Sequence, residues 1–197
     1  MWLSNVWESR RPGLRALSGV VEHATWRMVV CETNPMKLLL LRHAIAVPAD
    51  TSGIADEDRP LTTKGRKRFK RAARGLAEIV STPDLLLASP LLRARETAEI
   101  AGKSWGVKAT PEPLLAGGTP EALLAAVAAH SRLNVVVLVG HEPDLSKLLA
   151  HLIGGDGERV PLKKGGAALV ELDEATTSSG RLIWFMPPRL LRTLGGD

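Results

Sequence analysis

The stretch Lys37-Leu38-Leu39-Leu40-Leu41-Arg42-His43 decides the fold, because it places a histidine just past a short apolar run. Such a run, ended by polar residues, predicts a buried strand. Val135-Val136-Val137-Leu138-Val139-Gly140-His141 repeats the arrangement further along the chain, and between the two lies a third apolar run, residues 85–88, followed by Ser89-Pro90 and then by Arg93. In an open α/β sheet, ligands bind outside the carboxyl ends of the strands, so we expect these polar residues to lie close together.

The overall composition is that of one soluble globular domain. The chain has 197 residues, of which 45% are hydrophobic and 24% charged, enough for a proper core. Its net charge of +5 suits an anionic ligand. The cations are densest between residues 64 and 74, which we interpret as a solvated helix face. Because no aromatic residue beyond Phe69 interleaves them, we expect no nucleic-acid partner. No apolar stretch approaches the ~20 residues of a membrane span, so we expect no membrane association either.

Residues 1–35 differ in character from the rest of the chain. Three of the five tryptophans lie here, with scattered arginines and no sustained period. We predict a poorly ordered N-terminal extension over 1–35 and a domain over 36–190 that opens at Met36; the alternative is a short helix over about 14–30 that docks its tryptophans on the domain. The single cysteine, Cys31, excludes an intramolecular disulfide and favours a reducing, cytoplasmic location.

From Met36 onward, strand-like and helix-like patterns alternate. This alternation predicts a three-layer α/β/α sandwich with a mostly parallel central sheet of about six strands and an antiparallel portion at the end. The expected helices run from an N-cap at Thr62 or Thr63 to about 80, from Pro90 to about 105, from a cap at Thr119 to about 129, and over 144–153. The expected strands cover 37–41, 85–88, 107–110, 134–139, 167–172 and 182–186.

The residues at the three strand ends are suited to phosphoryl chemistry. A neutral imidazole such as His43 attacks phosphorus and forms a covalent intermediate that water then discharges. Arg42 and Arg93 supply guanidinium forks that match two phosphoryl oxygens at once. His141, if protonated, adds a further donor. Each residue alone has an ordinary structural explanation; their joint placement favours a site. No Cys pair or His pair stands at a metal-ligand interval, so we expect neither metal nor cofactor.

On these motifs the chain resembles the histidine phosphatase superfamily, which includes phosphoglycerate mutases, and within it the small SixA-like phosphohistidine phosphatases. The resemblance spans about Met36 to Pro187. It rests on Arg42-His43-Ala44, on Ser89-Pro90 followed by Arg93-Ala94 and Thr97-Ala98, on Gly140-His141-Glu142-Pro143, and on Arg59-Pro60-Leu61-Thr62-Thr63-Lys64-Gly65 before the first helix.

The resemblance implies that His43 is the phosphorylated nucleophile and that Arg42, Arg93 and His141 complete its phosphate pocket. It makes Thr62 a further candidate for substrate binding. Ala44 departs from the glycine that the wider superfamily usually has at this position. The SixA-like branch accepts alanine here, so we expect the chemistry to be preserved with a slightly tighter pocket floor.

The general acid is less evident from the sequence. Mutase-type members place a glutamate in a lid after the second helix, where this chain offers only Glu112. Glu142 is the acid we name as candidate, although a partner for the helix N-terminus is the simpler interpretation; Asp56, Glu57 and Asp58 are the others. An alkoxide leaving group needs a proton, whereas a phosphohistidine departs as neutral imidazole. The missing acid and the short insertions therefore favour N–P bonds presented by another protein.

The sequence thus predicts a metal-independent phosphatase acting through phospho-His43, with protein phosphohistidine as the favoured substrate. A small-molecule phosphomonoesterase for a sugar, nucleotide or lipid phosphate is the first alternative. A non-catalytic phosphate-binding module is the second, which the complete set of Arg42, His43, Arg93 and His141 disfavours. The expected partner is accordingly a phosphorylated protein or a small phosphorylated metabolite.

Overall fold

The computed structural model describes residues 35–172 and 179–196. The predicted N-terminal extension, and the alternative helix within it, lie outside the described residues. The described strands are β1 (Met36–Arg42), β2 (Leu85–Ala88), β3 (Ala109–Pro111), β4 (Val135–Gly140), β5 (Ala167–Leu172) and β6 (Gly180–Met186). The helices are α1 (Thr63–Ile79), α2 (Leu92–Trp105), α3 (Pro120–Ala128), α4 (Asp144–Ile153) and α5 (Pro188–Leu194), with three single turns of 3-10 helix, η1 (Asp56–Asp58), η2 (Pro113–Ala116) and η3 (Gly157–Arg159).

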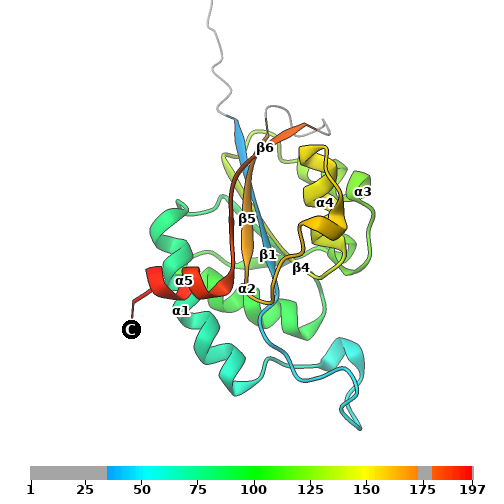
Figure 1. Cartoon of the computed structure of the whole chain (residues 1–197), viewed down its shortest axis with the longest axis vertical. Helices are drawn as coiled ribbons and strands as arrows, with labels where there is room; N and C mark the ends of the chain where they lie inside the picture. The colour runs from blue at the N-terminus through cyan, green and yellow to red at the C-terminus, as the bar shows by residue number, and fades with distance from the viewer. Residues whose placement is uncertain (1–34, 173–178, 197) are drawn as a thin grey trace, which may run out of the picture. The chain divides into compact units, whose positions relative to one another are not determined.

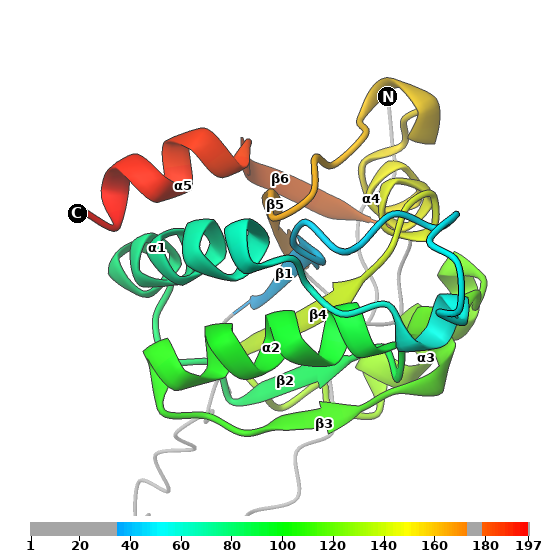
Figure 2. The same cartoon turned by 90° about the horizontal axis from the view of Figure 1, so that it is seen from below.

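The strands form one mixed sheet in the order β3-β2-β4-β1-β5-β6. β1, β2, β3 and β4 run parallel to one another, and β5 and β6 continue the sheet antiparallel beyond β1. Figure 2 shows β3, β2, β4 and β1 following one another across the domain. The predicted six-stranded, mostly parallel sheet with an antiparallel end is confirmed.

Helices cover both faces of this sheet, and β1 shows why. Successive side chains of a strand point to opposite faces. Leu39 and Leu41 accordingly join the apolar cluster beneath α1, α2 and α5, whereas Leu38 and Leu40 join the cluster beneath α3 and α4. All four are fully buried, and each contributes about 1.5–3 kcal/mol by burial. Figure 1 shows the two helical layers on either side of the strands.

The start of α1 is fixed tightly against the segment that follows β1. Thr62 is the N-cap, since its hydroxyl accepts a hydrogen bond of 2.9 Å from the amide of Gly65. A Cβ atom on Gly65 would lie 2.1 Å from the carbonyl oxygen of Ile45, so this contact requires glycine. The first turn of α1 therefore lies directly beside the residues after His43.

One helix boundary differs from the sequence prediction, and one helix was not predicted. α2 begins at Leu92 rather than at Pro90, because Leu91 is still extended and donates its amide to the Ser89 hydroxyl at 3.3 Å. α5 was not expected, and it carries the domain past residue 190. It is a short helix whose fully buried Leu191 packs into the cluster beneath α1, so tertiary contact rather than local pattern stabilises it. Within the described residues, no helix is long and apolar enough to span a bilayer.

Candidate active site

Three neighbouring strands deliver the candidate residues to one edge of the sheet. The amide of His43 donates to the carbonyl of Gly140 at 3.0 Å, and the amide of Ser89 donates to the carbonyl of Val139 at 2.9 Å. These hydrogen bonds align the carboxyl ends of β1, β4 and β2 with one another. The rings of His43 and His141 lie 5.0 Å apart between centroids, tilted by 49°, and only 5% and 8% of these residues is exposed. The structure thus brings both imidazoles together.

His43 is held as a neutral imidazole with one nitrogen available. Its Nδ1–H donates to the carbonyl of Ala44 at 2.7 Å, so Nε2 keeps its lone pair. Burial is the main cause that lowers the pKa of His43 to about 3; the hydrogen bond to Ala44 opposes this shift, and the electrostatic interactions with His141, Arg93 and Arg42 add to it. At neutral pH the ring is therefore unprotonated and able to attack an electrophile.

His141 is also neutral, and Ser89 sets its tautomer. The Ser89 hydroxyl oxygen accepts the amide of Leu91 and lies 2.8 Å from Nε2 of His141. The hydroxyl can therefore donate to Nε2, which leaves the proton of the imidazole on Nδ1. Burial, followed by the charge of Arg93, lowers the pKa of His141 to about 4. The structure thus supports a neutral N–H donor at His141 in place of the protonated one considered from sequence.

Both arginines are held by backbone oxygens. Nη1 of Arg42 donates to the carbonyl of Leu162 at 2.6 Å. Nη1 of Arg93 donates to the carbonyl of Asp56 at 2.6 Å, and its Nη2 donates to a carboxylate oxygen of the same residue at 3.0 Å. Burial lowers the pKa of each arginine, partly offset by Glu142 for Arg42 and by Asp56 for Arg93. Arginine keeps its charge in proteins, so two oriented cations flank the imidazoles.

The buried polar atoms that lack a protein partner gather at this edge. In the described part of the chain they are Nε of Arg42, Nε of Arg93 and Nδ1 of His141. Each is an N–H donor, and an unsatisfied buried donor costs about 1–3 kcal/mol. A tetrahedral oxyanion would satisfy donors of this kind, since its oxygens only accept. The arrangement is therefore suited to holding a phosphoryl group beside the His43 ring.

The two remaining predicted residues make structural contacts. The Thr62 hydroxyl, besides capping α1, lies 3.3 Å from the carbonyl of Ile45, to which it donates; its contact with substrate stays a prediction. Glu142 accepts the amide of Leu162 at 3.1 Å on one oxygen and the hydroxyl of Ser146 on the other. The carbonyl of Leu162 in turn accepts a hydrogen bond from Arg42. Glu142 therefore stabilises the loop that orients this arginine.

Thr97 and Asp56 are contributors whose contacts the sequence did not reveal. The buried Thr97 hydroxyl accepts the amide of Ala44 at 3.0 Å and donates to the carbonyl of Arg93 at 2.6 Å. It thereby ties the end of β1 to the first turn of α2. The available signals were the family motif, which contains Thr97, and the spacing of four residues from Arg93, which places both on the same face of a helix. Asp56 had no comparable signal, because its contact with Arg93 bridges two distant segments.

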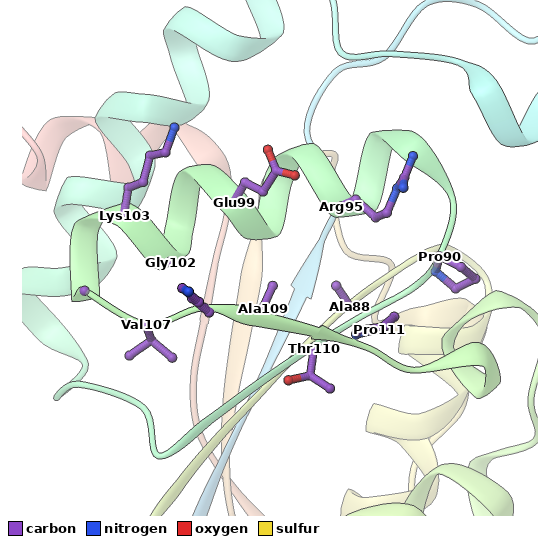
Figure 3. A pocket seen from close by; sticks show the side chains of 12 residues that line it. Ala88, Pro90, Arg95, Glu99, Gly102, Lys103, Val107, Ala109, Thr110 and Pro111 are labelled. Atoms are coloured by element: carbon purple, nitrogen blue, oxygen red, sulfur yellow. The ribbon is translucent and has the colours of Figure 1, made fainter.

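A separate cavity of about 660 Å³ lies between α2 and the edge strand β3 (Figure 3). Arg95, Glu99 and Lys103 line it from α2, and Ala109, Thr110 and Pro111 line it from β3. None of the four candidate residues borders it. Among the residues described, no group of three His, Cys, Asp or Glu side chains is arranged to hold a metal ion.

Comparison with known proteins gives concordant results. Residues 38–117 match the family described as histidine phosphatase superfamily (branch 1). The chain is 40% identical over 140 residues to an uncharacterized protein of Picosynechococcus sp., covering 66% of this chain and 82% of that protein.

Solved structures extend the likeness to the whole domain. A SixA structure from Agrobacterium tumefaciens is 28% identical with a TM-score of 0.67, covering 78% of this chain and 99% of that one. The protein histidine phosphatase SixA complexed with tungstate is 29% identical with a TM-score of 0.69, covering 79% and 99%. A mycobacterial glucosyl-3-phosphoglycerate phosphatase shares the fold alone, at 17% identity, a TM-score of 0.61 and coverage of 77% and 99%.

The residues that match the family model include His43 and Arg93, and the two SixA structures match over more than three quarters of this chain. Together with the paired imidazoles at the strand ends, they establish the family. The chain is a phosphatase of the histidine phosphatase superfamily, in its SixA-like branch.

Proposed function

We propose that this protein removes phosphate from phosphohistidine in other proteins, with His43 as the nucleophile. The observation that carries the proposal is the state of the His43 ring: buried, neutral at neutral pH, fixed through Nδ1 and with Nε2 free. A phosphoryl group beside it would meet Arg42, Arg93 and His141, which stabilise the charge that develops on the equatorial oxygens.

The reaction proceeds in two steps. In the first, Nε2 of His43 forms a bond to phosphorus while the bond from phosphorus to the substrate nitrogen breaks, and the substrate imidazole leaves with the bonding pair. It leaves neutral because its other nitrogen already carries a proton. In the second step, water attacks the phosphorus of phospho-His43, and the N–P bond returns its electron pair to Nε2. The proton lost by water stays on the released phosphate or passes to solvent, and His43 is regenerated.

The carboxylates near the site support an N–P substrate over a phosphomonoester. Both oxygens of Glu142 already accept hydrogen bonds. Glu112 accepts the amide of Leu114 at 2.9 Å and so caps its own turn. The hydrogen bond from Arg59, assisted by Arg93, lowers the pKa of Asp56, which opposes a role as proton donor. None of these is poised to protonate an alkoxide, and a neutral imidazole leaving group needs no such proton.

Two further expectations belong to this proposal. The partner is a phosphorylated protein, whose phosphohistidine side chain would enter the site at the carboxyl ends of β1, β2 and β4. The single cysteine is consistent with a cytoplasmic location, where thiols stay reduced.

A substrate comparison tests the proposal. We expect a phosphohistidine peptide to be hydrolysed with a higher kcat/KM than any member of a panel of sugar, nucleotide and lipid phosphomonoesters. Faster turnover of a monoester would make the protein a small-molecule phosphatase.

A trapping experiment separates catalysis from mere phosphate binding. Rapid acid-free quenching with substrate labelled in its phosphoryl group should leave label on the wild-type protein and none on His43→Ala. Label on neither, with no turnover, would show a phosphate-binding module. Circular dichroism on His43→Ala serves as the control for folding.

A further inference from the structure

A second group of cations lies next to the candidate active site. It lines a cavity of about 220 Å³, formed where the residues after β1, the first turns of α1, the loop before β5 and the start of α5 meet. Arg68, Lys163, Lys164, Arg189 and Arg192 line this cavity, which we call the basic cavity. Its apolar lining includes Phe69 and Ala72.

The backbone connects the basic cavity directly to the nucleophile. Ala44 and Ile45, which follow His43, are part of its lining. Gly165, another lining residue, donates its amide to the carbonyl of His43 at 3.0 Å. Lys163 and Lys164 immediately follow Leu162, whose carbonyl holds Arg42. The lining of the basic cavity therefore includes the residues that follow the nucleophile and the loop that holds Arg42.

Within the described part of the chain, the cations of the basic cavity are not paired with acidic residues, in contrast to several of the arginines elsewhere on the surface. Arg59, Arg66 and Arg181 each contact a carboxylate of this chain. Over residues 35–172 and 179–196, by contrast, no ion pair involves the five cations of the cavity, and no acidic residue is among those that line it. Burial and the neighbouring arginines, Arg68 first among them, lower the pKa of Arg192. Like charges are thus gathered here, which destabilises the free protein and favours binding of an anion.

We propose that the basic cavity is a second anion subsite, which binds the carboxylate of an acidic side chain near the phosphorylated histidine of the partner protein. This inference rests on the proposed function and adds to it a substrate preference. Guanidinium forks bind carboxylates with two parallel hydrogen bonds, and lysines beside them add charge. The subsite contacts a part of the substrate that does not react, so it lowers KM and leaves kcat little changed.

The test compares two phosphohistidine peptides of equal length. One carries Asp and Glu around the phosphohistidine, and the other carries Asn and Gln at the same positions. We expect the wild-type protein to favour the acidic peptide by about tenfold in KM at low salt, a preference that declines as salt screens the charges. In the double variant Arg68→Gln/Arg189→Gln the two KM values should become nearly equal, with kcat unchanged.

A matched control uses α1, the helix that carries Arg68, and the same change in net charge. Lys67 and Lys70 are exposed on α1 and do not line the basic cavity. Lys67→Gln/Lys70→Gln should keep the preference for the acidic peptide. The inference is overturned if wild type shows no preference, if the preference survives in Arg68→Gln/Arg189→Gln, or if the control loses it equally.

The design also separates this inference from the proposed function. If neither phosphohistidine peptide is hydrolysed while a phosphomonoester is, the proposed substrate class is wrong. The same comparison is then made with acidic and neutral phosphoserine peptides and the same two double variants. A preference for the acidic phosphoserine peptide that depends on Arg68 and Arg189 would retain the subsite, and its absence would remove it.

Discussion

The two groups of cations at this edge of the sheet differ in how they are held. Arg93 is buried and Arg42 is partly buried, and carbonyl oxygens fix their Nη1 atoms. Arg68 and Arg189 are exposed and make no ion pair among the described residues. Fixed, desolvated donors stabilise charge that develops in a transition state, whereas exposed cations attract a ground-state anion and are screened by salt. The first group should therefore govern kcat and the second KM.

The largest expected effect tests this division at Arg93. Arg93→Ala should lower kcat by about 10²–10³, equivalent to about 2.7–4 kcal/mol, as for the loss of one oxyanion donor. Steady-state kinetics on the best substrate measures it. Arg95→Ala is the matched control, because Arg95 lies on the same helix, exposed and outside the site. If Arg93→Ala raised KM and left kcat unchanged, Arg93 would act as the cations of the basic cavity are expected to act, and the proposed difference between the two groups would be wrong.

The next effect concerns the residue that sets the tautomer of His141. Ser89→Ala removes the partner of Nε2 and should reduce kcat about tenfold with KM little changed, because the Nδ1–H donor is then less well oriented. Ser89→Thr keeps a hydroxyl and should recover part of the loss. If the threonine variant is as impaired as the alanine variant while both remain folded, packing rather than the hydrogen bond explains the effect.

The strand ends were predictable because apolar runs and their terminating residues are local signals. The run 38–41 has no polar residue, which predicts a central strand, and the family motif then assigned His43 its role. α4 and β5 were predicted at their observed bounds, 144–153 and 167–172. Their apolar patterns are long enough to distinguish a helix from a strand without tertiary information.

The contacts that complete the site depend on residues distant in sequence. Asp56 meets Arg93 only because the loop after β1 crosses the start of α2. The basic cavity joins Arg68 of α1 to Arg189 and Arg192 of α5, a helix stabilised by its packing and not by local pattern. Sequence analysis therefore interpreted the cations between residues 64 and 74 as an ordinary solvated face. That holds for Lys67 and Lys70, whereas Arg68 lies at the meeting point of two helices.

A third expectation uses the buried histidine as a reporter of its environment. The pKa of His43 is about 3 in the folded protein, against about 6.5 in an unfolded chain. Between these values the unfolded state binds more protons, so stability is full above pH 6.5 and is lost as the pH falls towards 3.

Urea unfolding at about pH 7.5 and about pH 5 measures this linkage. Wild type should lose about 2 kcal/mol more than His43→Asn on that acidification. His130→Asn, which removes an exposed histidine, should behave as wild type does. If wild type and His43→Asn lost equal amounts of unfolding free energy, His43 would be solvated like the cations of the basic cavity. The proposed difference in burial between the two regions would then be wrong.

The smallest expected effect concerns Asp56, an exposed residue that contacts one of the buried cations. Asp56 has a side chain that is 57% exposed, yet it binds the buried Nη2 of Arg93. An oxyanion at the site competes with this carboxylate for Arg93, while the backbone carbonyl of Asp56 keeps the guanidinium in place. Asp56→Asn should therefore strengthen competitive inhibition by tungstate about two- to fivefold, the range expected for an exposed ion pair.

Asp58→Asn provides the control, since Asp58 lies in the same turn, is exposed and makes no contact with Arg93. If Asp56→Asn weakens inhibition instead, the carboxylate orients Arg93 rather than competing for it. The fixed character of the buried cations would then depend on a side chain in the loop after β1 as well as on backbone oxygens. That loop would become part of the catalytic framework, and its length and sequence would limit how much phosphate-binding energy Arg93 supplies.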